Sequence, residues 1–130
     1  MVYIYFFDDT DESKNTGIPT FNIVDGYSFQ FINISKDQAN DILDNLDFES
    51  HVRLKSIADD LSKIFNKEIH SSSKVVPVKT DEELVSNQYL EVRLSEKYDK
   101  ETDPIETKYI FYIAHYHDAK GKSDVTPYIQ

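Results

Sequence analysis

The sequence KYIFYIAHYH, residues 108–117, decides the fold class because it is rich in aromatic and β-branched residues and contains no glycine or proline. Such a stretch predicts a β-strand, and apolar side chains on both faces indicate a central position in a sheet. Because side chains alternate along a strand, Phe111, Ile113, His115 and His117 are expected on one face. The two histidines should therefore lie side by side at the end of this strand.

Several other stretches have the composition of strands. A hairpin turn is expected at Asp25-Gly26, and Pro77 restricts its own segment to a sheet edge because proline donates no backbone hydrogen bond. Residues 90–94 alternate apolar and polar side chains, which predicts a strand with one face in water, joined to the central strand by a long hairpin. The strands predicted before the central one cover about residues 2–7, 21–23, 27–34, 75–78 and 90–94.

Two helices are predicted between these strands. Ser35 opens the first helix with a glutamine three residues later, the spacing of a capping box, and apolar residues recur at helical spacing over 39–46. A second helix is predicted over 54–65, where six apolar residues recur with the same period. Asp47 or Ser50 is expected to cap it.

Together, these elements predict an α+β fold within a single compact domain of 130 residues. The expected architecture is a mainly antiparallel sheet of about five or six strands with two helices packed on one face. Two consecutive helices after a run of strands do not suit a parallel, doubly wound sheet.

The net charge of the chain limits the kinds of molecule that it is expected to bind. Twenty-four acidic and fourteen basic residues leave a formal net charge of -10, which repels phosphate backbones and anionic membranes and favours basic partners. We therefore expect no direct nucleic-acid binding and no membrane binding. The sequence has no cysteine, so disulfides and thiolate chemistry are excluded, and a cytoplasmic location is expected.

The histidine pair is the first candidate site. His115 and His117 can share one zinc ion if a third ligand is supplied, and Glu91 lies opposite His115 in one of the two registers that the hairpin allows. A bound zinc ion would be structural rather than catalytic, and the alternative is that both histidines simply form hydrogen bonds at a strand end. Other nominated ligands are His51, His70 and Asp118.

The second candidate site is an acidic stripe on the first helix. Asp37, Asp41 and Asp44 recur at i, i+4 and i+7 on the face opposite the apolar residues. Their spacing of about 6 Å resembles that of successive phosphates in a nucleic-acid strand, which predicts a docking surface for a basic groove. The alternative is an ordinary solvated face. An acidic loop is expected to add to this surface through Asp8, Asp9, Asp11 and Glu12.

In size, charge and lack of an enzyme motif, the chain resembles small acidic phage-encoded inhibitors, including anti-CRISPR proteins directed at RNA-guided nucleases. The resemblance implies a non-enzymatic, one-to-one complex with a large basic nuclease in the cytoplasm of a host cell. The acidic stripe and the acidic loop are the first contact residues to consider.

Two other functions remain open from the sequence. One is a small metal-dependent hydrolase that uses His115 and His117, and the other is an immunity protein or antitoxin for a basic toxin. The sequence contains no G-x-S-x-G, H-E-x-x-H or glycine-rich phosphate-binding motif.

Overall fold

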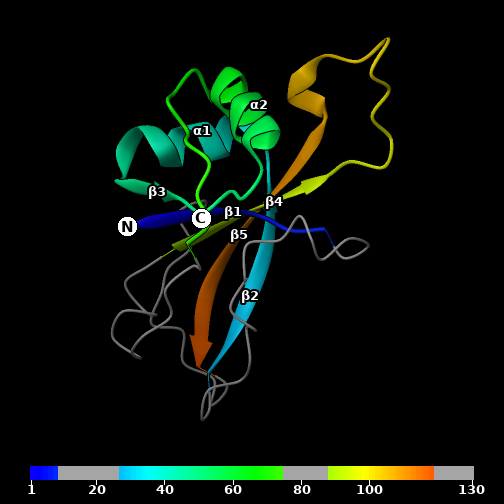
Figure 1. Cartoon of the computed structure of the whole chain (residues 1–130). Coiled ribbons are helices and arrows are strands. Elements are labelled where there is room, and N and C mark those ends of the chain that lie inside the picture. The colour runs from blue at the N-terminus through cyan, green and yellow to red at the C-terminus, as the bar shows by residue number, and fades with distance from the viewer. Residues whose placement is uncertain (9–26, 75–87, 119–130) are drawn as a thin grey trace.

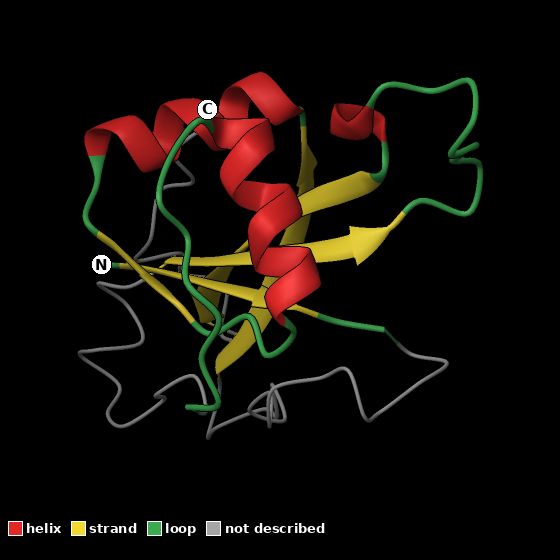
Figure 2. Ribbon diagram, turned by 45° about the horizontal axis from the view of Figure 1, so that its top comes forward, coloured by secondary structure: helices red, strands yellow, loops and turns green. Residues whose placement is uncertain are grey.

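The structure is a computed structural model that describes residues 1–8, 27–74 and 88–118. Within this part of the chain, five strands form one sheet in the order β2-β5-β4-β1-β3, and two helices lie over one face of it (Figure 1, Figure 2). The predicted α+β arrangement is therefore confirmed. The elements are β1 (Val2–Phe6), β2 (Tyr27–Ile34), α1 (Lys36–Asn45), β3 (Phe48–Ser50), α2 (Lys55–Phe65), β4 (Gln88–Leu94), the short 3-10 helix η2 (Ile105–Thr107) and β5 (Tyr109–Asp118).

Strand β5 holds the central position that its sequence predicts. It pairs antiparallel with all of β2 on one side and with residues 89–94 of β4 on the other. The connection from β4 to β5 is the predicted long hairpin, and η2 lies just before β5. These two ladders are the longest in the sheet, which makes the sheet mainly antiparallel.

Strand β1, in contrast, pairs parallel with both of its neighbours, β4 and β3. The sequence patterns predicted neither the parallel pairing nor β3, which has three residues and is too short to show an alternation. Flanking hydrogen bonds extend this pairing: the Val2 N–H donates to the Asp47 carbonyl over 2.8 Å, and the His51 N–H donates to the Ile4 carbonyl over 2.7 Å. β3 thus forms one edge of the sheet, and its pairing with β1 is what identifies it as a strand.

The two helices begin in different ways. At α1 the predicted capping box is present: the Gln38 N–H donates to Ser35 Oγ over 3.1 Å, and the Ser35 N–H donates to Gln38 Oε1 over 2.8 Å. The predicted cap of α2 is wrong, because the residue at its N-cap is Leu54, which makes no capping hydrogen bond through its side chain. Asp47 and Ser50 lie too early in the chain, beside and within β3.

The main core lies between the helices and one face of the sheet. Phe65 of α2 packs on Phe111 of β5 with ring centroids 5.2 Å apart, and Phe6 of β1 meets Tyr109 edge to face. The apolar stripes predicted for both helices are therefore confirmed, except at Leu46, which is exposed at the C-terminal cap of α1. Their buried members are Ala39, Ile42, Leu43, Ile57, Ala58, Leu61, Ile64 and Phe65.

The opposite face of the sheet is also buried at its centre, which corrects the prediction that β4 has one face in water. Tyr5, Tyr89 and Ala114 are fully buried there, and Glu91 is only 2% exposed. Leu94, expected on the apolar side of the strand, is instead exposed at the strand end. A carboxylate buried in this way needs hydrogen-bond partners.

Some predictions fall outside the described residues. These are the strand at 21–23, the hairpin turn at Asp25-Gly26, the strand at 75–78 and the loop residues Asp9, Asp11 and Glu12. Among the helices that the structure does describe, none is long and apolar enough to cross a membrane.

Candidate functional site

The acidic stripe lies on the outer surface of α1. Asp37, Asp41 and Asp44 are all exposed, while Ala39 and Ile42 of the same helix are buried against the sheet. The side chain of Asp37 is 93% exposed and that of Asp44 is 49% exposed. The predicted exposure of the three carboxylates is therefore present in the fold.

The three carboxylates differ in what surrounds them. Lys67, which follows α2, forms an ion pair with Asp44 and so neutralises part of the stripe. Asp41 accepts a hydrogen bond from the Asn45 side chain over 3.1 Å, and Lys36 lies 3.7 Å from Asp37. Because an exposed pair at such a distance is weak, Lys36 offsets little of the negative charge of Asp37.

A shallow hollow lies beside the C-terminal end of α1. It has a volume of about 510 Å³, and the exposed apolar side chains of Met1 and Leu46 contribute to its wall. The last turn of α1 has no basic residue, so nothing on the helix itself offsets the negative end of the helix dipole. We call this feature the helix-end hollow; it is lined by Met1, Leu43, Asp44, Asn45, Leu46, Asp47 and Phe48.

Asp8 does not join this surface. Met1, in the wall of the helix-end hollow, precedes β1, whereas Asp8 follows the other end of the strand. Asp8 lines a different hollow, together with Arg93 of β4. The start of the predicted acidic loop and the helix-end hollow are therefore separated by the length of β1.

The strand register also separates two of the predicted metal ligands. Glu91 lies opposite Tyr112, and His115 lies opposite Gln30 of β2 in the backbone pairing. In this register neither Glu91 nor its neighbour Leu90, which pairs with Ile113, lies opposite His115. The carboxylate of Glu91 is already bound, because it accepts hydrogen bonds from the Tyr5 hydroxyl over 3.0 Å and from Arg93 Nε over 2.5 Å.

The other nominated ligands are dispersed. His51 is buried after β3, where its ring contacts Tyr3 edge to face and its Nδ1 lies 2.9 Å from the Lys74 carbonyl. His70 is exposed beside Glu68. Among the side chains that the structure describes, which do not include those of residues 27–30 and 115–118, no group of three or more His, Asp and Glu could hold a metal ion. Zinc binding at His115 and His117 stays a prediction.

The cluster of Tyr5, Glu91 and Arg93 was missed by the sequence analysis. Glu91 and Arg93 share one face of β4 at i and i+2, a pattern that also occurs on any solvated strand, and Tyr5 is 86 residues away in sequence. Burial, the charge of Glu91 and the hydrogen bond to it raise the pKa of Tyr5 well above its ordinary value. The hydroxyl therefore remains protonated and acts as a fixed donor.

Comparison with known proteins supports the fold. No protein-family model matches the sequence, and no curated protein matches it. Among solved structures, the chain is similar to B116 of Sulfolobus turreted icosahedral virus (STIV), with a TM-score of 0.52 and 9% sequence identity. The match covers 88% of this chain and 97% of that chain. At this identity, the likeness shows a common α+β fold alone.

Proposed function

We propose that the protein is a non-enzymatic inhibitor that binds a basic, nucleic-acid-handling effector such as an RNA-guided nuclease through α1. The observation that carries this proposal is the exposed acidic face of that helix, where Asp37 and Asp41 lie in a line with the partly neutralised Asp44. A basic groove built for phosphates would meet carboxylates at a similar spacing. The chain's formal net charge of -10 would favour encounter with such a groove at long range.

The helix-end hollow supports the same proposal because charge alone gives little affinity. Interfaces usually combine a desolvated apolar anchor with a charged rim. Here Met1 and Leu46 provide exposed apolar surface, and Asp44 and Asp47 lie beside them in the wall of the same hollow. A partner with an apolar side chain next to a lysine or arginine would match this surface.

The proposal is tested by titrating the protein into target-cleavage reactions of a panel of RNA-guided nucleases. We expect that cleavage by at least one nuclease falls to zero near equimolar protein, since a non-enzymatic inhibitor acts by occupancy. The double variant Asp37→Lys, Asp41→Lys should lose inhibition by about 100-fold or more, because each reversal replaces an attraction by a repulsion. Inhibition by the wild-type protein should also weaken as salt rises.

The matched control is the double variant Glu101→Lys, Glu106→Lys, which changes the net charge by the same amount at exposed positions near η2. It should inhibit nearly as well as the wild type. Equal loss in both variants would reduce the effect to net charge and reject α1 as the contact surface. Absence of inhibition across the panel, or inhibition at far less than one protein per nuclease, would contradict the proposed function itself.

A further inference from the structure

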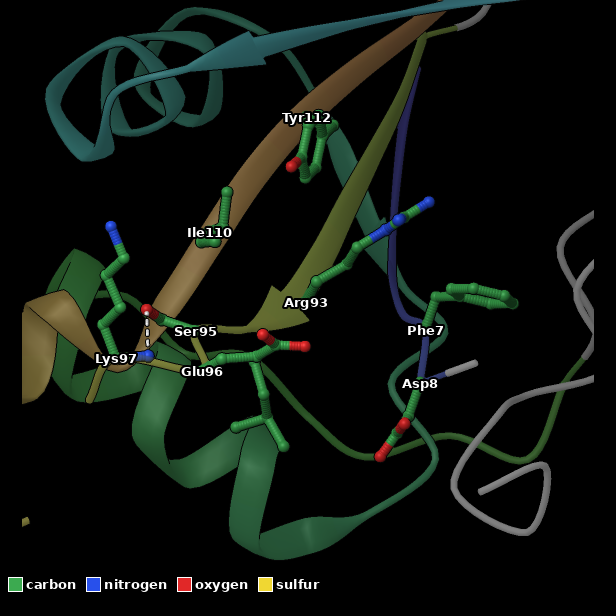
Figure 3. A pocket seen from close by; sticks show the side chains of 9 residues that line it. Phe7, Asp8, Arg93, Ser95, Glu96, Lys97, Ile110 and Tyr112 are labelled. Carbon is green, nitrogen blue, oxygen red and sulfur yellow. Dashed lines mark hydrogen bonds between the residues drawn. The ribbon is translucent and has the colours of Figure 1, made fainter. Parts of the chain in front are cut away.

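A second hollow, with a volume of about 650 Å³, lies where β1 and β4 end and β5 begins. Its size is that of a small-molecule site. Figure 3 shows Arg93 extending from β4 in the gap between Tyr112 of β5 and Phe7, which follows β1. We call this feature the arginine hollow; it is lined by Phe7, Asp8, Arg93, Leu94, Ser95, Glu96, Lys97, Ile110 and Tyr112.

Arg93 is held in a fixed position. Its Nε donates to Glu91 Oε2 over 2.5 Å, and Glu91 Oε1 accepts from the buried Tyr5 hydroxyl over 3.0 Å. The side chain of Glu91 is 3% exposed, so this carboxylate is oriented inside the protein and not in water. The guanidinium is therefore positioned by buried groups before any ligand arrives, which lowers the entropic cost of binding.

Two aromatic rings lie within cation-π distance of the guanidinium of Arg93. Its Cζ lies 5.1 Å from the ring centroid of Phe7 and 5.2 Å from that of Tyr112, both within the range of a cation-π contact. The side chain of Arg93 is nevertheless 41% exposed. Since Nε is used by Glu91, the two terminal nitrogens are the donors that face an incoming group.

The remaining charges around the hollow are mixed. Lys97 adds a second cation, whereas Asp8 and Glu96 add carboxylates. Arg93 is the member held in place by a buried partner, while Glu96 and Lys97 are exposed. Within the described part of the chain, the two terminal nitrogens of Arg93 have no hydrogen-bond partner. Such an arginine fork matches the two oxygens of a carboxylate or phosphate, and the aromatic rings match a flat apolar group.

We propose that the arginine hollow binds a small organic anion that carries a flat ring and a carboxylate or phosphate group. The oxyanion contacts the terminal nitrogens of Arg93, and the ring packs against Phe7, Ile110 or Tyr112. This inference does not depend on the proposed function, because the arginine hollow and the helix-end hollow lie at opposite ends of β1.

The test is a titration of the full chain with phenylacetate, phenyl phosphate and phenethylamine. Binding is monitored in NMR spectra through the side-chain Nε–H signals of arginine and the backbone amide signals. We expect saturable shifts at Arg93 and Tyr112 with one or both anions and no saturable shift with the amine. The stronger of the two anions distinguishes a carboxylate from a phosphate ligand. Arg93→Lys should weaken anion binding about tenfold or more, because it removes the fork while retaining the charge.

Arg53→Lys, a change at the other arginine of the sequence, is the matched control and should leave the affinity unchanged. If Arg93→Lys fails to fold, Tyr112→Leu tests the site instead. This variant leaves the hydrogen bonds of the buried Glu91 intact, and it should also weaken anion binding. Unchanged affinity in the folded variants, tighter binding of phenethylamine, or no saturable shift with either anion would overturn the proposal.

Discussion

Tyr5 is the residue whose hydroxyl matters most for the buried polar cluster. It is fully buried and donates to Oε1 of the equally inaccessible Glu91, and among the described residues it is the donor on which this oxygen depends. Tyr5→Phe should therefore lower the free energy of unfolding by about 1 to 3 kcal/mol. Urea denaturation at pH 7 measures this difference.

The control for this change is Tyr112→Phe, at a half-buried tyrosine on β5, the strand on the other side of β4. It removes a hydroxyl of the same kind and should change stability by less than about 0.5 kcal/mol. A loss as large in the control as in Tyr5→Phe would show that Glu91 does not depend on the Tyr5 hydroxyl.

The raised pKa of Tyr5 also makes the stability of the fold depend on pH in the alkaline range. A raised pKa means that the folded state retains the proton longer than the unfolded chain, so its stabilising contribution is complete below the ordinary tyrosine pKa near about 10 and is lost as pH rises above it. Tyr109, whose pKa is raised by burial and by its hydrogen bond to Asp60, acts in the same direction. Melting temperatures measured from pH 8 to about pH 11 should fall most steeply above about 10, and less steeply in Tyr5→Phe. Equal slopes would contradict the assignment.

For Asp60 we expect the opposite pH dependence of stability, in the acid range. Burial acts to raise the pKa of Asp60, but hydrogen bonds from Lys108 over 2.8 Å and Tyr109 over 2.6 Å outweigh it and hold that pKa below its ordinary value. A lowered pKa gives stability that is present above the unfolded value near about 3.9 and is lost as pH falls through the folded value. Asp60→Asn should therefore cost about 1 to 3 kcal/mol at neutral pH and progressively less in acid.

Asp59→Asn, at the exposed neighbour that pairs with Lys55, is the control for Asp60. Exposed i,i+4 pairs contribute only about 0.3 to 0.5 kcal/mol, so this variant should be nearly as stable as the wild type. Denaturant midpoints between pH 3 and pH 7 compare the two. A constant difference between wild type and Asp60→Asn across this range would rule out the linkage.

At the scale of single elements, α1 depends on its cap more than α2 does. Ser35 satisfies a backbone donor at the start of α1, whereas α2 begins at Leu54 without a side-chain cap and relies on its buried face. Ser35→Ala should cost about 0.5 to 2 kcal/mol in unfolding free energy. Ser56→Ala, at an exposed position in the first turn of α2, is the control and should be neutral or slightly stabilising.

Hydrogen exchange shows which helix loses stability when the cap is removed. Amides in the first turn of α1 should lose protection in Ser35→Ala, while those of α2 should not change. Loss of protection throughout both helices would mean that the cap supports the core as a whole and not α1 alone.

At the scale of the whole molecule, the charge imbalance opposes folding. A formal net charge of -10 on 130 residues produces self-repulsion that is stronger in the compact state than in the unfolded chain. Added sodium chloride up to about 0.3 M should therefore raise the denaturant midpoint, because it screens this repulsion. The Asp37→Lys, Asp41→Lys variant should respond less. A midpoint that falls with salt would show that ion pairs such as Lys67–Asp44 dominate instead.

The sequence by itself determined the features that depend on neighbours along the chain. The central strand β5, the capping box of α1, the apolar faces of both helices and the exposure of the acidic stripe all follow from periodicity and local hydrogen bonding. Each of these patterns spans at most about a dozen residues and repeats with the geometry of one element. They were accordingly predictable without the fold.

The tertiary structure alone decided the features that join distant residues. Pairing with β1 turned residues 48–50 into β3, and the β4–β5 register set Glu91 opposite Tyr112. Burial of the second sheet face then enclosed Glu91 with Tyr5, and packing brought Lys67 onto Asp44. None of these contacts repeats along the chain, because each is formed by long-range packing. The helix-end hollow and the arginine hollow, which depend on such contacts, could therefore be located only in the folded molecule.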